Sequence, residues 1–216
     1  MTDFAAQRRN MVDGQVRTAD VTDLRVLSAM MEVARERFVP APSAPLAYLD
    51  RDLPVGAANR RLLKPMVLAR LLQAADIGPA QRVLDVGCAT GYAAALLARM
   101  AGEVVALEQD ESLLQVARVE LSALPNVRIV AGPLEAGWQA AGPYDVILLE
   151  GATEAVPQAL CRQLKDGGRL VCVLGGGPGA KAMLYLRSGD DIGGRALFDA
   201  SAAVLPGFAK APAFAF

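Results

Sequence analysis

The stretch Arg82–Tyr92 holds the residues best suited to bind a ligand. It reads R-V-L-D-V-G-C-A-T-G-Y, so an apolar strand that carries Asp85 runs into a turn at Gly87, and a helix opens at Gly91. Backbone N–H groups and the positive end of a helix dipole meet at such a turn, which favours a polar ligand. We therefore expect a ligand site at this turn.

The spacing of the glycines narrows the kind of ligand. The turn Gly87–Gly91 lacks the G-x-G-x-x-G pattern of dinucleotide-binding proteins and the G-x-x-x-x-G-K-[ST] pattern of phosphate loops. What remains is D-x-G-x-x-x-G, followed by Glu108 at the end of the next predicted strand. Glu108 lies 23 positions after Asp85, close to the roughly 20-residue offset of a carboxylate that binds ribose hydroxyls.

The composition excludes several kinds of chemistry. The 216 residues include no histidine, which excludes a Ser-His-Asp triad, a Cys-His pair and histidine-ligated metals. The three cysteines, Cys88, Cys161 and Cys172, are odd in number and show no C-x-x-C spacing. A disulfide framework and structural zinc are therefore not expected, and no metal site is predicted.

The charge and hydropathy of the chain indicate which binding partners and which cellular compartment to expect. The chain carries 22 basic and 23 acidic residues, for a net charge of −1, which gives no support for nucleic-acid or membrane-surface binding. The N-terminus lacks the apolar run of a signal peptide, and no apolar run approaches the length that spans a bilayer. We expect a cytoplasmic protein; the oligomeric state stays open.

Strands and helices alternate from residue 82 onward. The pattern predicts strands over 82–86, 104–107, 127–130, 145–149 and 169–174, and helices over 91–100, 111–122 and 154–164. Continuous apolar strands that alternate with helices are typical of a parallel sheet covered on both faces. Residues 182–187 and 196–205 then predict two strands without a helix between them. We expect a Rossmann-like, doubly wound α/β fold that ends in an antiparallel hairpin.

The first third of the chain is expected to be a helical and loop extension. Residues 8–39 show helical spacing, with Thr22 as a possible cap, and residues 40–63 form a proline-rich loop whose apolar residues suggest that it is packed. Pro65 suits the first turn of the next helix. The whole chain, 1–216, therefore reads as one domain, with an extension over 1–78 and a Rossmann-like core over 79–216.

The combination of Asp85, the glycine turn and Glu108 resembles class I S-adenosylmethionine-dependent methyltransferases. The N-terminal third is more specifically similar to protein-L-isoaspartate O-methyltransferases. Five segments carry that similarity: Met11-Val-Asp-Gly-Gln15, Val26-Leu-Ser-Ala-Met30, Arg37-Phe-Val-Pro40, Ala47-Tyr-Leu-Asp50 and Asp52-Leu-Pro-Val-Gly56. Gly137-Trp138, Tyr144-Asp145 and Gly167-Gly-Arg-Leu-Val171 continue it over nearly the whole chain.

This resemblance implies methyl transfer from S-adenosylmethionine to the free carboxylate of isoaspartyl residues in damaged proteins or peptides. A carboxylate is ionised at neutral pH, so the reaction needs no general base and depends on positioning and desolvation. In the family the glycine turn approaches the methionine portion of the cofactor, and the acid after the second strand binds the ribose hydroxyls. The implied cofactor-binding residues are Asp85, Gly87, Cys88, Ala89, Gly91, Tyr92, Glu108, Gln109, Pro133 and Leu134.

The chain departs from the family pattern at four places. Ala89 replaces the middle glycine of the turn, and Ala131–Leu134 lacks the acid expected near the adenine. The segment 57–64 before Pro65 contains no Ser or Thr, whereas the family has hydroxyl groups there, close to the reacting carboxylate. Glu150 follows the fourth core strand, where the family has a small or apolar residue and where open α/β sheets bind ligands.

These departures leave three functions open. In the first, Arg60 or Arg61 replaces the hydroxyls and clamps the substrate carboxylate through two hydrogen bonds. In the second, the acceptor is a different group, and Glu150, which would repel a carboxylate, acts as a base or orients a hydroxyl or amine. In the third, the chain binds the cofactor without catalysis. The candidate catalytic residues are Asn59, Arg60, Arg61 and Glu150.

Overall fold

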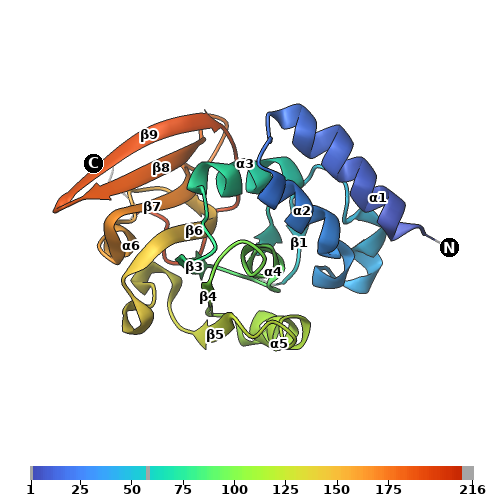
Figure 1. Ribbon diagram of the computed structural model, residues 1–216, viewed down its shortest axis with the longest axis horizontal. Helices are drawn as coiled ribbons and strands as arrows, with labels where there is room; N and C mark the ends of the chain where they lie inside the picture. Colours follow the sequence, from blue (N-terminus) through green and yellow to red (C-terminus); the bar gives the residue numbers. More distant parts are fainter. Residues whose placement is uncertain (1, 57–58, 211–216) are drawn as a thin grey trace, which may run out of the picture.

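The computed structural model describes residues 2–56 and 59–210 of the chain. Seven strands form one sheet in the order β5-β4-β3-β6-β7-β8-β9 (Figure 1). Their bounds are β3 Arg82–Val86, β4 Glu103–Glu108, β5 Val127–Ala131, β6 Tyr144–Thr153, β7 Leu164–Leu174, β8 Lys181–Ser188 and β9 Asp191–Asp199. Strands β3 to β7 pair in parallel, and β8 and β9 pair antiparallel. The predicted Rossmann-like sheet with a terminal hairpin is confirmed.

The sheet buries one hydrophobic cluster on each face. Alternate side chains of a strand point to opposite faces, so Val83 packs into one cluster while Leu84 and Val86 pack into the other. Both faces of the central strands are buried, which explains why these strands read as continuous apolar runs. The cluster that contains Val83 also takes in the N-terminal extension.

The helices are short and lie on both sides of the sheet (Figure 1). Their bounds are α1 Phe4–Met11, α2 Leu24–Glu32, α3 Pro65–Ala75, α4 Tyr92–Leu97, α5 Glu111–Glu120 and α6 Gln158–Cys161. Buried residues of α2, α3, α4 and α5 pack into the cluster that contains Val83, and those of α6 into the opposite one. Among the described residues, none of the helices is long and apolar enough to cross a membrane.

The N-terminal extension is less regular than its sequence pattern suggests. The predicted helix over 8–39 is divided into α1, a π-helical turn at Val12–Val16, a 3-10 turn at Arg17–Ala19, and α2. The cap of α2 is Asp23, whose carboxylate accepts a 2.8 Å hydrogen bond from the Arg25 N–H, so the expectation of Thr22 was wrong. The predicted packing of the loop over 40–63 holds for Tyr48 and Leu53, which are buried, but not for Leu46 and Leu49, which are 39% and 48% exposed. The described part of this segment also contains a two-stranded ribbon of β1, Leu53–Pro54, and β2, Arg61–Leu62.

The C-terminal region differs from the prediction in two ways. The helix predicted over 154–164 is reduced to α6, because β7 already starts to pair at Leu164. The last strand covers 191–199 rather than 196–205, since Gly189, at φ +59°, makes a tight turn directly after β8. Residues 200–208 therefore leave the sheet, and this segment returns across β6.

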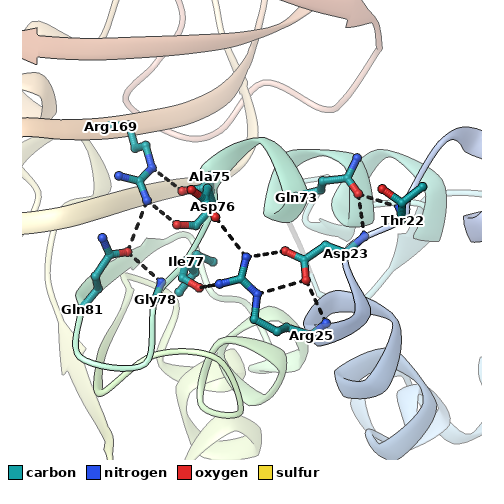
Figure 2. A network of polar contacts seen from close by, with 10 residues as sticks. All are labelled: Thr22, Asp23, Arg25, Gln73, Ala75, Asp76, Ile77, Gly78, Gln81 and Arg169. Carbon is teal, nitrogen blue, oxygen red and sulfur yellow. Dashed lines mark hydrogen bonds and ion pairs between the residues drawn. The ribbon is translucent and has the colours of Figure 1, made fainter.

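Helix α3 connects the N-terminal extension to the sheet through its carboxyl end (Figure 2). Asp76 takes a left-handed conformation there, and two arginines bind the surrounding carbonyl groups. Arg25, from the extension, donates to the Ile77 carbonyl at 2.6 Å and to the Asp76 carboxylate at 3.0 Å. Arg169, from β7, donates to the carbonyls of Ala75 and Asp76. Cations bound at a helix carboxyl end also interact favourably with its dipole.

Replacing Arg169 by Ala is expected to lower the free energy of unfolding by about 2 kcal/mol, because two carbonyl groups lose a charged donor. For a chain of this length the melting temperature is then expected to fall by about 4–8 °C. Thermal unfolding followed by circular dichroism measures the change. Lys181→Ala, which breaks the exposed ion pair with Asp199, serves as the control. An equal loss in both variants would contradict a specific role for Arg169.

Candidate functional site

Three buried carboxyl groups lie together at the carboxyl ends of β4, β3 and β6. Asp85, Glu108 and Glu150 share the sheet face of Val83, because side chains two positions apart lie on one face of a strand. Their exposed fractions are 0%, 0% and 3%. The order of the strands reverses between β3 and β6, and open α/β sheets bind their ligands at that point. We call these strand ends the switch-point region.

The glycine turn follows β3 and needs left-handed backbone geometry. Gly87 and Gly91 have φ values of +78° and +97°, and Ala89 has +49°. A non-glycine residue in this conformation costs about 1–2 kcal/mol, so the replacement of the family's middle glycine strains the turn. The N–H groups of Gly87 and Cys88 both donate to the Leu107 carbonyl, at 2.9 and 3.1 Å. These two N–H groups therefore already have a partner within the chain, and the binding of a cofactor at Gly87 and Cys88 stays a prediction.

The carboxylate of Glu108 is bound by the side chain of Arg60. Arg60 Nη1 and Nη2 lie 3.2 and 2.7 Å from its two oxygens, and Nη2 also donates to the Gly87 carbonyl at 3.0 Å. The backbone N–H groups of Ala89, Gln109 and Asp110 donate to the same carboxylate at 2.8–3.1 Å. Arg60 does clamp a carboxylate through two hydrogen bonds, but that carboxylate belongs to the chain itself.

The placement of Arg60 follows from the ribbon that precedes α3. The Val55 N–H donates to the Arg60 carbonyl at 3.1 Å, which holds the start of β2 against β1. The guanidinium then reaches β4 with only 3% of the residue exposed. A buried ion pair loses the hydration of both charges, so it needs good geometry and further hydrogen bonds to be stable. Arg60 and Glu108 have both.

Leu205 also packs on the glycine turn, next to Arg60. The Leu205 N–H donates to the Ala152 carbonyl at 2.9 Å, and the Ala152 N–H donates to the Ala203 carbonyl at 2.8 Å, so residues 203–205 add a short parallel pairing to β6. A Cβ atom at Gly151 would lie 2.6 Å from Leu205 Cγ, and one at Gly87 would lie 3.1 Å from Leu205 Cδ1. The side chain of Leu205 can approach because both positions are glycine.

The carboxyl groups of Asp85 and Glu150 form a pair that holds a proton. If both were ionised, neither Asp85 oxygen would have a donor among residues 2–56 and 59–210. A proton on Glu150 supplies one. Burial raises the pKa of Asp85 to about 7, even though a hydrogen bond from Glu150 lowers it. Burial and the nearby Asp85 charge raise the pKa of Glu150 well above its usual value. Both shifts favour the protonated form, and the larger shift of Glu150 places the shared proton on that side chain.

Glu150 lies where the pairing of β6 with β7 is irregular. The register shifts between Leu148 and Ala152, which forms a β-bulge, yet Leu148 and Ala152 both stay on the sheet face of Val83. Glu150 lies inside the bulge, next to the glycine that admits Leu205. We expected Glu150 to act as a base or to orient an acceptor; in the structure it faces Asp85. Its role in catalysis stays a prediction.

Arg35 is a buried cation that sequence reasoning did not single out. It is 0% exposed, donates to the carbonyls of Ala47 and Leu63 at 2.8 Å each, and stacks 4.7 Å above the Tyr92 ring. Burial lowers the pKa of Arg35, while Tyr92 and the carboxyl group of Glu150 raise it. Arg35 has no distinguishing sequence signal, because it begins a charged Arg-Glu-Arg run that looks like a solvated helix end. Tyr92 therefore packs against the N-terminal extension, and Phe38 meets its ring edge-on.

The structure brings some of the predicted site residues together and leaves others apart. Asp85, Gly87, Ala89, Glu108, Arg60 and Glu150 meet at the switch-point region. Arg61 instead donates to the Asn59 side chain at the surface, at 2.9 Å. Gln109 and Pro133 are exposed, whereas Cys88 and Leu134 are buried. Residues 57 and 58 of the predicted substrate segment lie outside the described residues.

Comparison with known proteins gives consistent matches. The family model described as protein-L-isoaspartate(D-aspartate) O-methyltransferase (PCMT) matches residues 6–193. A protein-L-isoaspartate O-methyltransferase of Methylorubrum populi is 44% identical over 86% of this chain and 86% of its own length. One from Koribacter versatilis is 40% identical over 87% and 84%.

Solved structures share the fold. A protein-L-isoaspartate O-methyltransferase superposes with a TM-score of 0.79 at 23% identity, covering 93% of this chain and 66% of that one. A second, from Plasmodium falciparum and in complex with S-adenosyl-L-homocysteine, gives 0.78 at 17% identity, covering 95% and 99%. These two likenesses establish a common architecture that extends through the N-terminal third.

Proposed function

Because the chain belongs to the protein-L-isoaspartate(D-aspartate) O-methyltransferase family, we propose that it transfers a methyl group from S-adenosylmethionine to the free carboxylate of isoaspartyl residues in proteins. The observation that carries the proposal is a relationship of 44% identity that spans 86% of both chains. A match to residues 6–193 includes the glycine turn, Glu108 and the segment before α3.

The chemical groups of the switch-point region are of the types that bind S-adenosylmethionine. Glu108 ends β4 with a carboxylate that is held by three backbone N–H groups and is suited to ribose hydroxyls. Gly87 has no side chain, so a ligand can approach its backbone closely once Leu205 and Arg60, which face its Cβ position, have moved. The buried carboxyl group of Asp85 has the protonated Glu150 as its donor, and its remaining lone pairs suit an ammonium group. Ribose hydroxyls can bind Glu108 only after Arg60 has given up its hydrogen bonds to that carboxylate.

In this reaction the residues of the chain position the cofactor and exclude water. S-adenosylmethionine, when bound, supplies a methyl group on a positively charged sulfur. Glu108 and the glycine turn position it, and the buried surroundings of Asp85 exclude water. The acceptor carboxylate is already ionised at neutral pH, so neither Asp85 nor Glu150 has to remove a proton. The absence of histidine from the chain is compatible with a reaction that depends on positioning and desolvation.

Methyl-ester formation tests the proposal. Purified protein with radiolabelled S-adenosylmethionine is expected to methylate a peptide that contains one isoaspartyl residue, and base treatment should release the label as methanol. The matched control is the same peptide with an ordinary aspartyl residue, which is expected to stay unlabelled. Equal labelling of the two peptides, or none above the background of protein-free mixtures, would contradict the proposed acceptor.

A second candidate function is methyl transfer to a neutral or cationic acceptor. It is favoured by the carboxyl pair of Asp85 and Glu150, since an additional carboxylate beside them would be repelled. In that case label from S-adenosylmethionine is expected on an amine or hydroxyl acceptor and should resist mild base. Glu150→Gln separates the alternatives: it should reduce transfer to an amine, whereas transfer to a carboxylate should be kept or increased.

A further inference from the structure

We propose that two side chains of the protein, Arg60 and Leu205, close its cofactor site and that S-adenosylmethionine must displace both in order to bind. This inference rests on the proposed function, because it concerns the regulation of the same site. Above Gly87 the two side chains converge: a Cβ atom there would lie 3.4 Å from Arg60 Nη2 and 3.1 Å from Leu205 Cδ1. We call this pair of side chains the latch.

Arg60 uses the atoms that a ribose would need. A carboxylate has about four lone-pair sites, and five N–H donors already point at the two oxygens of Glu108. Three of these donors are backbone groups of the turn and of the residues after β4, so they belong to the fold. The other two come from Arg60. Ribose hydroxyls can therefore bind Glu108 only where the guanidinium of Arg60 lies, and the two compete for the same oxygens.

Leu205 covers Gly87 beside the guanidinium of Arg60. Its side chain is 5% exposed and packs on Gly87 and Gly151. The backbone of residues 203–208 is held to β6 and its end, because Leu205 bonds to Ala152 and the Phe208 carbonyl accepts a 2.9 Å hydrogen bond from the Glu154 N–H. A ligand that lies on Gly87 must therefore move Leu205, and the segment that carries it, away from β6.

The closed arrangement carries a cost that binding can recover. The Arg60 side chain is removed from water, and its Nε has no hydrogen-bond partner in the part of the chain that the structure describes. Withdrawal of the guanidinium restores its hydration, while Glu108 keeps its three backbone donors. A protein that is mostly closed binds its ligand with an affinity reduced by the open fraction. The latch therefore sets the cofactor concentration at which the site fills.

Arg60→Ala is expected to lower the dissociation constant for S-adenosylhomocysteine by about tenfold or more, because the competitor for Glu108 is removed. Isothermal titration calorimetry measures this value without any turnover. Arg60→Lys keeps the charge but not the planar contact through two N–H groups. Its dissociation constant is expected to lie between those of Arg60→Ala and the unmodified chain. The matched control is Arg118→Ala, which breaks the exposed ion pair with Glu111 and should leave the constant unchanged.

Hydrogen exchange of the unmodified chain tests the Leu205 half of the latch without a substitution. Saturation with S-adenosylhomocysteine is expected to speed exchange of the Leu205 and Ala152 amides, whose bonds join residues 203–205 to β6. Amides of the glycine turn should slow. Unchanged or slower exchange at Leu205 in the presence of the ligand would overturn the displacement of this segment, even if Arg60→Ala failed to fold.

The outcomes separate the latch from the proposed function. If the unmodified chain binds S-adenosylhomocysteine and Arg60→Ala binds it no more tightly, the latch is overturned and the function stands. If neither the unmodified chain nor the Arg60 variants bind it, both proposals fall. Tighter binding by Arg60→Ala together with faster exchange at Leu205 supports both parts of the latch.

Discussion

Replacement of Glu108 by Gln is expected to lower the free energy of unfolding by about 3–5 kcal/mol, because it leaves the buried guanidinium of Arg60 without a counter-charge. The side chains of this pair are 3% and 0% exposed, so water cannot compensate. A loss of this size corresponds to a fall in melting temperature of about 6–20 °C for a chain of this length. Chemical denaturation monitored by the fluorescence of Trp138 measures it.

A double-mutant cycle shows whether the loss belongs to the pair. Adding Arg60→Met to Glu108→Gln is expected to recover part of the lost stability, since an apolar side chain of similar length tolerates burial better than an unpaired cation. Glu111→Gln, which affects an exposed pair with Arg118, is the control and should cost less than about 1 kcal/mol. Simple additivity of the Arg60 and Glu108 effects would contradict the coupling.

The carboxyl pair of Asp85 and Glu150 is expected to make the protein less stable as the pH rises from about 4 to above 7. Both groups have a pKa above the usual value in the folded state, and that of Asp85 is raised to about 7. Between the unfolded and folded pKa values the folded chain binds more protons than the unfolded chain, so the free energy of unfolding falls as the pH rises. This contribution is complete below about pH 4.

Glu150→Gln is expected to remove much of this dependence. The amide is always neutral and can donate to Asp85, so the variant should match the unmodified protein near pH 5. Near pH 9 it should be more stable by about 2 kcal/mol, since a shift of one pKa unit corresponds to about 1.4 kcal/mol. Melting temperatures across this range, with Glu111→Gln as the exposed control, provide the measurement. A variant curve parallel to that of the unmodified protein would rule out the shared proton.

The sequence pattern was sufficient for the parts of the fold that depend on local periodicity. Strands β3, β4 and β5 begin and end within one residue of their predicted bounds, because each is a short apolar run limited by turn residues. The placement of Asp85 and Glu108 on one sheet face followed from the same regularity. The irregular start was not predictable in this way, since the π-helical turn at Val12–Val16 packs against α3, which lies about 50 residues further along the chain.

The closure of the site depends on contacts that no local pattern records. Arg60 and Glu108 are 48 positions apart, and their pairing depends on how the β1–β2 ribbon lies beside β4. The apolar residues 200–205 were predicted to belong to the last strand. The turn at Gly189 instead makes residues 191–199 the last strand of the sheet. Leu205 was thereby free to pack on Gly151, a contact between segments more than 50 residues apart.

The burial of Cys88 within the glycine turn gives the chain its own chemical reporter. Burial raises the pKa of its thiol, so the reactive thiolate is scarce while the turn is covered. Cys161 and Cys172 are also buried, but they lie in the cluster on the other sheet face. Alkylation of Cys88 that outpaces that of the other two would therefore time the local opening of the turn, whereas equal rates at all three would time global unfolding.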